Sequence, residues 1–350
     1  MSGNIFRKIK SPKKTKFIVV IIACSIAALM IGYGSYLWFN VSKMYEPLTA
    51  DSNISADVDE NENEAIEGES PLPEISLEDE VTIVPVEKPT GKVDILLLGV
   101  DNRNNGFSGR TDTMIFMRID LSDGKIKMVS LMRDTLVKMD GHPKNRLNTA
   151  FRFGSYKLLK STLEDNFGLS PDYYVVVNFY GMENIIDALN GIELSVNSSE
   201  KTDMNKSIKE LNKIDKDKKT PFIEKTGLQN LNGRQALAYM RVRHAGNDGD
   251  AGRIERQQTV LSALFDKAKQ VNLEQIPGLI NTIAQYVRTD IPISEMLKIA
   301  NAVKSLNVDK LETYRFPNKY YCGSYKDIPS VVIPRNKKNE LDKLKKFLDG

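Results

Sequence analysis

The chain has 350 residues, of which 41% are hydrophobic and 27% are charged, as in an ordinary globular protein. This composition excludes a collagen-like chain, a fully disordered chain and a small disulfide-stabilised protein. The formal net charge of +3 conceals three regions of different charge. Residues 1–43 carry seven basic side chains and no acidic one, whereas residues 44–87 carry fourteen acidic side chains and no basic one. Subtracting these from the totals of 49 and 46 leaves 42 basic and 32 acidic residues for 88–350, a net charge of +10.

The first hydrophobic feature is the uncharged run at 17–39, which ends in a cluster of aromatic residues. About 20 apolar residues in a helix cross the hydrocarbon of a bilayer, and aromatic side chains favour its interface. Six Lys and Arg residues precede the run, so the positive-inside rule predicts a cytoplasmic tail at 1–16 and a transmembrane helix at 17–39. A cleaved signal peptide has a shorter apolar region, of roughly 7–15 residues. A lipoprotein processing site at Cys24 is disfavoured because the apolar run continues well past it.

This topology places everything after the helix on the outer side of the cell membrane. Cys24 then lies in the membrane and Cys322 beyond it, so the two cannot form a disulfide. Residues 40–91 are acidic, contain several prolines and have few large apolar side chains, which is typical of an extended linker. We expect this linker to hold an outer domain, residues 92–350, off the membrane but near its surface.

The outer domain contains alternating strand and helix patterns. A short apolar run at 95–100 is typical of a buried strand. Residues 113–119 and 126–132 flank Ser-Asp-Gly, a turn signal, and together predict a β-hairpin. The lysine-rich stretch at 200–220 is expected to be an exposed excursion.

The other elements continue this alternation. In chain order the patterns predict a helix at 148–167 ending before Gly168, a strand at 173–179, a helix with Met182, Ile185, Ile186 and Leu189 on one face, a strand at 191–196, a short helix after Gly233, an amphipathic helix at 252–271, a helix around 296–303, a strand near 331–333 and a basic C-terminal helix. Strands that alternate with helices indicate an α/β domain with helices on both faces of the sheet.

The first group of candidate functional residues lies around the predicted hairpin. Asp112 precedes its first strand and Arg133 follows its second, and the two numbers average 122.5, the middle of the turn. An antiparallel hairpin therefore places Asp112 opposite Arg133 at its open end, with Arg110 and Asp134 nearby. Asp101 leaves the carboxyl end of the preceding strand, where α/β sheets bind ligands. Ordinary charges at strand ends would give the same pattern, so this group alone does not define a site.

Two further groups carry arginines. In a strand, Arg241 and Arg243 would share a face at a separation of about 7 Å, which suits a diphosphate, although a solvated pair on an edge strand has the same spacing. Asp250, Arg253 and Gln257 lie in the opening turns of the long helix. The free N–H groups and positive dipole at a helix N-terminus favour an anion. Arg253 and Gln257, four residues apart, share one helix face.

Several common catalytic motifs are absent from the sequence. It has no HExxH, P-loop, GxSxG or CxxC motif, and it has only two histidines. Zinc hydrolases and familiar serine hydrolases are therefore disfavoured, and an outer location disfavours a nucleotide-driven reaction. Carboxylates beside several arginines indicate a hard cation such as Mg²⁺ and a phosphorylated ligand.

The chain resembles the LytR-CpsA-Psr family of bacterial cell-envelope proteins over about residues 92–350. The resemblance rests on six motifs in order: DILLLGVDNR at 94–103, GRTDTM at 109–114, SLMRDT at 130–135, NRLNTAFRFG at 145–154, GLQNLNGRQALAYMRVRH at 227–244 and DAGRIERQ at 250–257. It implies an αβα sandwich with a central mixed sheet and an apolar cavity for a lipid tail. Met132, where the family usually has Pro, and the Asn148-Thr149-Ala150 segment, where it has Asn-His-Ala, depart from the pattern.

The resemblance also implies roles for individual residues. The residues matching positions that hold a pyrophosphate head group are Arg110, Arg133, Arg241, Arg243, Arg253 and Gln257. Asp101, Asp112 and Asp250 match carboxylates associated with metal binding or catalysis, and Arg110 is counted with Asp112 and Asp250 as catalytic. Mg²⁺, or Mn²⁺ in its place, would be held by Asp101 and Asp112.

The implied activity is phosphotransfer from a polyprenyl-pyrophosphate-linked anionic glycopolymer, of wall teichoic acid or capsular type, to the 6-hydroxyl of N-acetylmuramic acid in peptidoglycan. Asp112 is the first candidate for the general base and Asp250 the second. Two alternatives stay open: a polyprenyl-pyrophosphate pyrophosphatase, which needs no acceptor, and a non-catalytic lipid- or glycopolymer-binding regulator of the envelope. Sixteen residues before the membrane helix are too few for a DNA-binding fold, so no nucleic-acid partner is expected.

Overall fold

A computed structural model describes residues 39, 42–45, 81–86, 88, 90–100, 107, 109–122, 125–215, 219–242, 249–271, 275–305, 311–326 and 328–350. Across these ranges, no helix is both long and apolar enough to cross a bilayer. The predicted cytoplasmic tail lies outside the described residues, as does the predicted transmembrane helix except for Phe39.

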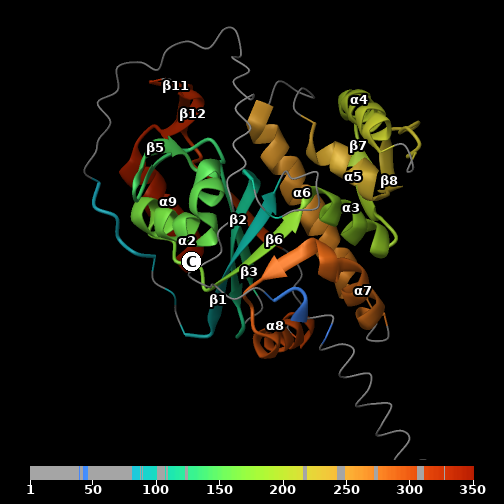
Figure 1. Cartoon of the computed structure of the whole chain (residues 1–350), viewed down its shortest axis with the longest axis horizontal. Helices are drawn as coiled ribbons and strands as arrows, with labels where there is room; N and C mark the ends of the chain where they lie inside the picture. The colour runs from blue at the N-terminus through green and yellow to red at the C-terminus, as the bar shows by residue number, and fades with distance from the viewer. Residues whose placement is uncertain are drawn as a thin grey trace, which may run out of the picture.

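A six-stranded mixed sheet forms the centre of the molecule (Figure 1). Its strands, in spatial order, are β10 (Leu311–Phe316), β3 (Ile126–Leu131), β2 (Thr111–Asp120), β1 (Lys92–Val100), β6 (Tyr173–Asn178) and β9 (Val287–Thr289). Strand β1 runs parallel to β6 and antiparallel to β2, while β10 runs parallel to β3. Open α/β sheets bind ligands at the carboxyl ends of their parallel strands, so a ligand site is expected at that edge of the sheet.

The β2–β3 pair is the predicted hairpin. Ile115 pairs with Ser130 and Ile119 pairs with Ile126, so the hairpin is centred on the predicted turn. Because side chains alternate along a strand, this register also fixes which residues meet at the open end. The strand at 95–100 is confirmed within β1.

Helices cover both faces of the sheet, which confirms the predicted sandwich. On one face lie α2 (Asn148–Phe167) and α9 (Lys337–Asp349), whose leucines share a core with β1 and β2. On the other face α6 (Gly249–Lys269) and α8 (Ile293–Ser305) pack on a second core. Helix α2 ends where predicted because Gly168 adopts a left-handed conformation, with φ of 70°, which glycine accepts without steric cost.

A smaller layer packs beside the sheet and has its own core. It consists of α3 (Phe179–Ala188), β7 (Ile192–Val196), α4 (Ser198–Ile214), β8 (Gly227–Leu231) and α5 (Gly233–Met240). Helix α4 corrects the expectation of an exposed excursion at 200–220. Its lysines lie outward, whereas Met204, Ile208 and Leu211 recur every three or four residues and are buried. A capping box between Asn197 and Glu200 starts the helix.

Two small hairpins lie next to the end of β3. One consists of β4 (Leu136–Met139) and β5 (His142–Arg146), and the other of β11 (Tyr320–Tyr325) and β12 (Ile328–Pro334). The backbone N–H of Val332 donates to the carbonyl of Asp134 at 2.8 Å, which joins β12 to the chain after Arg133. The sequence patterns predict only part of β12 among these strands, and they miss β8, β9, β10 and α7 (Ile276–Ile283).

Both ends of the predicted linker contact the folded domain. The N–H of Thr289 in β9 donates to the carbonyl of Met44 at 2.8 Å, and the N–H of Val86 donates to the carbonyl of Gly168 at 2.9 Å. Residues 46–80, the middle of the linker, lie outside the described residues. The described ends are therefore attached to the sheet edge and to the end of α2.

Candidate functional site

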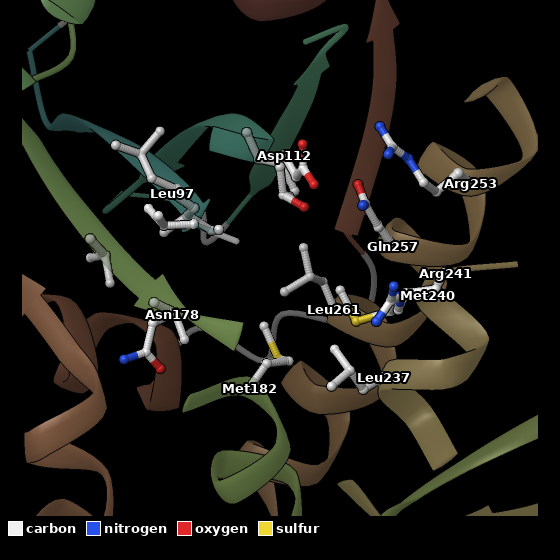
Figure 2. Close-up of a pocket in the computed structure, with 17 residues that line it drawn as sticks. Leu97, Asp112, Asn178, Met182, Leu237, Met240, Arg241, Arg253, Gln257 and Leu261 are labelled. Carbon is white, nitrogen blue, oxygen red and sulfur yellow. The ribbon is translucent and has the colours of Figure 1, made fainter. Parts of the chain in front are cut away.

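A cavity of about 410 Å³ lies at the carboxyl ends of β1 and β6 (Figure 2). The sheet forms one wall and helices α3, α5 and α6 form the other. Most of the lining is apolar, with Leu97, Val175, Met182, Leu237 and Leu261 among the residues that face it. The charged and amide side chains that also line the cavity are those of Asp112, Asn178, Arg241, Arg253 and Gln257.

Asp112 reaches the cavity because β2 contains a bulge. Gly99 pairs with Thr113 and Val100 pairs with Thr111, which leaves Asp112 as the extra residue between them. A bulge of this kind redirects a side chain that regular alternation would place on the other face. Asp112 thereby lies on the same wall as Thr113 and Ile115.

Asp112 and Arg133 meet as the hairpin register predicts. The Arg133 Nη1 lies 2.5 Å from the Asp112 Oδ1, and the Arg133 Nε lies 3.3 Å from the Asp134 Oδ2. Arg146 in β5 extends this chain of charges, with its Nη1 at 3.8 Å from the Asp134 Oδ1. The carboxylate that lines the cavity is therefore oriented by an arginine just beyond it.

Helix α6 supplies the facing polar groups. Arg253 and Gln257 are only 4% and 7% exposed although both are polar. Figure 2 shows them on successive turns, with their polar ends turned toward Asp112. The helix is fixed in rotation because the Gln258 Nε2 donates to the Ser130 Oγ at 2.9 Å and Ile254 packs in a cluster with Met132 and Val332.

Arg241 reaches the cavity from the end of a helix, which corrects the strand geometry predicted for this residue. It is the C-cap of α5, with helical φ and ψ of −91° and −8°. The helical pattern continues because Ala238, Tyr239 and Met240 are buried in the core of the smaller layer. Arg243 lies outside the described residues, so its predicted role at a pyrophosphate stays a prediction.

The residues predicted from the sequence divide into three groups. Four line the cavity together: Asp112, Arg241, Arg253 and Gln257. Arg133 joins them through Asp112, while Arg110 directly precedes β2 and is not among the lining residues. Asp101 and Arg243 lie outside the described residues, and Asp250 is in the first turn of α6 with its side chain undescribed.

A buried ion pair that the sequence patterns do not reveal supports Arg241. The Arg256 Nε lies 3.0 Å from the Glu200 Oε1, and its Nη1 donates to the carbonyl of Val242 at 3.4 Å. Both side chains are more than nine-tenths buried. Burial raises the pKa of Tyr239, and the nearby Glu200 carboxylate raises it further while Arg256 opposes the shift. The pair spans 56 residues, so no local spacing could have indicated it.

The Asp112 carboxylate fits a hard cation whose other ligands are water and the phosphates of a bound substrate. Among the described side chains, no group of three or more His, Cys, Asp and Glu could hold a metal ion. Mg²⁺ usually retains waters and needs only one or two carboxylates in addition to substrate phosphates. Asp112, 32% exposed at its side chain, meets that requirement, and Asp101 follows the last described residue of β1.

The fold and the cavity define an αβα sandwich protein with a largely apolar ligand cavity that carries arginines. The chain belongs to the LytR_cpsA_psr family, whose family profile matches residues 49–347. Regulatory protein MsrR of Staphylococcus aureus strain Mu50 is 34% identical over 275 residues, which cover 75% of this chain and 76% of MsrR. These matches confirm the family resemblance of the six sequence motifs.

Two further comparisons concern transferases of teichoic acid. The polyisoprenyl-teichoic acid–peptidoglycan teichoic acid transferase TagU of Halalkalibacterium halodurans is 28% identical over 322 residues, covering 88% of this chain and 92% of TagU. The solved structure of TagT bound to LIIa-WTA is similar with a TM-score of 0.59 and 25% identity, over 74% of this chain and 90% of that one. The family therefore includes distant relatives named as teichoic acid–peptidoglycan transferases.

Proposed function

We propose that the protein is a phosphotransferase that moves an anionic glycopolymer from a polyprenyl-pyrophosphate carrier to peptidoglycan, at the muramic acid 6-hydroxyl. One observation carries the proposal: a single cavity combines apolar walls, which suit a prenyl chain, with Arg241, Arg253 and Gln257, which suit a pyrophosphate. The names of TagU and TagT support the same class of donor. The proposed site faces the outer side of the cell membrane, to which residues 17–39 would attach the chain.

The arginines act by stabilising charge. Arg241 and Arg253 line one cavity with a single described carboxylate, Asp112, so the site has a positive balance among its described side chains. In transfer, the acceptor hydroxyl oxygen forms a bond to the phosphorus that carries the glycopolymer. The bond from that phosphorus to the bridging oxygen breaks, and polyprenyl phosphate leaves with the electron pair. Fixed guanidinium groups stabilise the charge that accumulates on this leaving group.

A carboxylate removes the proton of the acceptor hydroxyl. Asp112 is the first candidate because it lines the cavity, and Asp250, in the first turn of α6, is the second. Arg133 holds the Asp112 carboxylate in place through its ion pair. Mg²⁺ bound by Asp112 and Asp101 would supply further neutralisation of the pyrophosphate charge.

Reconstitution tests the role of the cavity arginines. The full chain in vesicles is supplied with a lipid-linked oligosaccharide donor, a glycan acceptor and Mg²⁺. Arg241→Ala is expected to reduce transfer by about 100-fold or more, because one charge-stabilising donor contributes roughly 10²–10³ in rate. The matched control is Arg152→Ala, on α2 at the opposite face of the sheet, which is expected to keep wild-type activity. Normal transfer by Arg241→Ala would contradict the proposed role.

A further inference from the structure

Residues 42–45 are attached to the edge of the central sheet. Tyr45 forms a parallel bridge with Thr289 in β9, and the N–H of Thr289 donates to the carbonyl of Met44. Strand β9 is the last strand of the sheet on that side, so this short segment covers backbone groups that an edge strand would otherwise expose. Figure 1 shows the segment, in blue, beside β9.

The attachment limits the distance between β9 and the end of the uncharged run. Met44 follows Phe39 by five residue steps, and an extended chain spans at most roughly 3.6 Å per step, or about 18 Å in total. The real span is shorter because the N–H of Tyr45 donates to the carbonyl of Ser42 at 3.3 Å, which closes a turn. If residues 17–39 cross the membrane, the β9 edge lies within about 18 Å of its outer interface.

The same edge adjoins the cavity. Val175 of β6 pairs with Thr289, and both Val175 and Val177 line the cavity wall. The surface around the attached segment also suits an interface, since Phe39 is 59% exposed, Tyr45 is 41% exposed and Lys43 lies over the Phe39 ring at 4.5 Å. Helix α7, two elements before β9, has no charged residue in its sequence IPGLINTI. Aromatic and apolar groups beside a lysine favour the headgroup region of a bilayer.

We infer that residues 42–45 dock on β9 and hold this edge of the domain, with the adjoining cavity wall, against the outer surface of the phospholipid bilayer. A lipid-linked donor could then enter the cavity while its carrier stays near the membrane. This inference rests on the membrane anchor and lipid-linked donor of the proposed function.

Energy transfer in vesicles tests the inference. The full chain, with Cys24→Ser and Cys322→Ser, carries a donor fluorophore at Gln285→Cys, an exposed position just before β9. The matched control carries the fluorophore at Lys346→Cys, an exposed position on α9 across the sheet. With acceptor dyes on phospholipid headgroups, transfer efficiency at position 285 is expected to be at least twice that at position 346. Equal efficiencies would overturn the docking.

Two insertions separate docking from a long tether. Ten Gly and Ser residues inserted between Asn40 and Val41 lengthen the link between the uncharged run and the docked segment, so transfer efficiency at position 285 is expected to fall. The same insertion after Glu60 is expected to leave it unchanged. The reverse pattern would overturn the inference. The measurement needs no substrate, so intact docking together with absent glycopolymer transfer would count against the proposed function alone.

Discussion

The two walls of the cavity are built in different ways. The sheet wall, from β1, β2 and β6, takes its geometry from backbone pairing, and a single bulge sets the position of Asp112. The helix wall, from α3, α5 and α6, is held by contacts between distant parts of the chain, including the buried Arg256–Glu200 pair. The sheet wall is therefore governed by register, whereas the helix wall depends on individual buried side chains.

The largest expected effect comes from the charge on the helix wall. Arg253→Ala removes a buried guanidinium that faces Asp112 across the cavity, and we expect a loss of roughly 10²–10³ in kcat/KM for glycopolymer transfer. Steady-state kinetics with a lipid-linked donor measure it. Arg253→Lys should recover only part of the activity because an ammonium lacks the planar fork that contacts two phosphate oxygens. Wild-type kinetics in Arg253→Ala would show that the helix wall does not bind the head group.

The second prediction breaks the helix wall itself. Arg256→Met leaves the Glu200 carboxylate buried without its ion-pair partner, and we expect the free energy of unfolding to fall by about 3–5 kcal/mol. Urea denaturation measures the change. The double variant Arg256→Met, Glu200→Gln should recover much of this loss because no uncompensated charge remains. If both variants are equally destabilised, the ion pair is not what holds α6 to α4.

The difference between the walls also explains what the sequence can predict. The hairpin register follows from one turn signal, so the contact between Asp112 and Arg133 is predictable from residue spacing alone. Helix periodicity likewise places Arg253 and Gln257 on one face. By contrast, β9 has three residues and β10 joins the sheet from the far end of the chain, so neither has a local pattern strong enough to stand out.

Two segments differ from their predicted conformations for specific physical reasons. The lysine content of α4 obscures the apolar residues at 204, 208 and 211, which recur at helical spacing. The two-residue spacing in Arg241-Val242-Arg243 suits a strand, yet α5 continues through Met240 and ends at Arg241. In both segments, packing against a neighbouring helix decides the conformation.

The third prediction perturbs the sheet wall by volume. A Cβ added at Gly99 would lie 3.0 Å from the Thr113 Cβ, tighter than ordinary contact. We expect Gly99→Ala to lower the free energy of unfolding by about 1–3 kcal/mol, as overpacking does. Thermal unfolding measures it, and the double variant Gly99→Ala, Thr113→Ala should be closer to wild type because it removes the Thr113 Oγ1, which would lie 3.3 Å from the added Cβ. An unchanged Gly99→Ala would mean that the β1–β2 pair is not closely packed there.

The smallest expected effect is a dependence of stability on pH near the sheet wall. Burial raises the pKa of Asp290 above its ordinary 3.8, although its hydrogen bond from the Tyr174 N–H, at 2.7 Å, opposes the shift. A raised pKa in the folded state adds stability below the unfolded pKa, and this is lost as pH rises through the folded value.

The variant Asp290→Asn mimics the protonated carboxyl at every pH. We expect it to be more stable than wild type at pH 7, by less than about 1 kcal/mol, and to match wild type near pH 4. Chemical denaturation at several pH values makes the comparison. If Asp290→Asn is less stable than wild type at pH 7 and approaches it toward pH 4, the Asp290 pKa is lowered instead.

The most direct test of the account identifies the product of a defined donor by mass spectrometry. The full chain is incubated with a synthetic polyprenyl-pyrophosphate oligosaccharide, Mg²⁺ and a peptidoglycan glycan, and parallel reactions omit the glycan. We expect two products, polyprenyl phosphate and a conjugate in which a phosphodiester joins the oligosaccharide to the glycan, and little release of oligosaccharide phosphate without the glycan. Release of oligosaccharide phosphate at the same rate with or without the glycan, and no joined product, would contradict transfer and identify a pyrophosphatase.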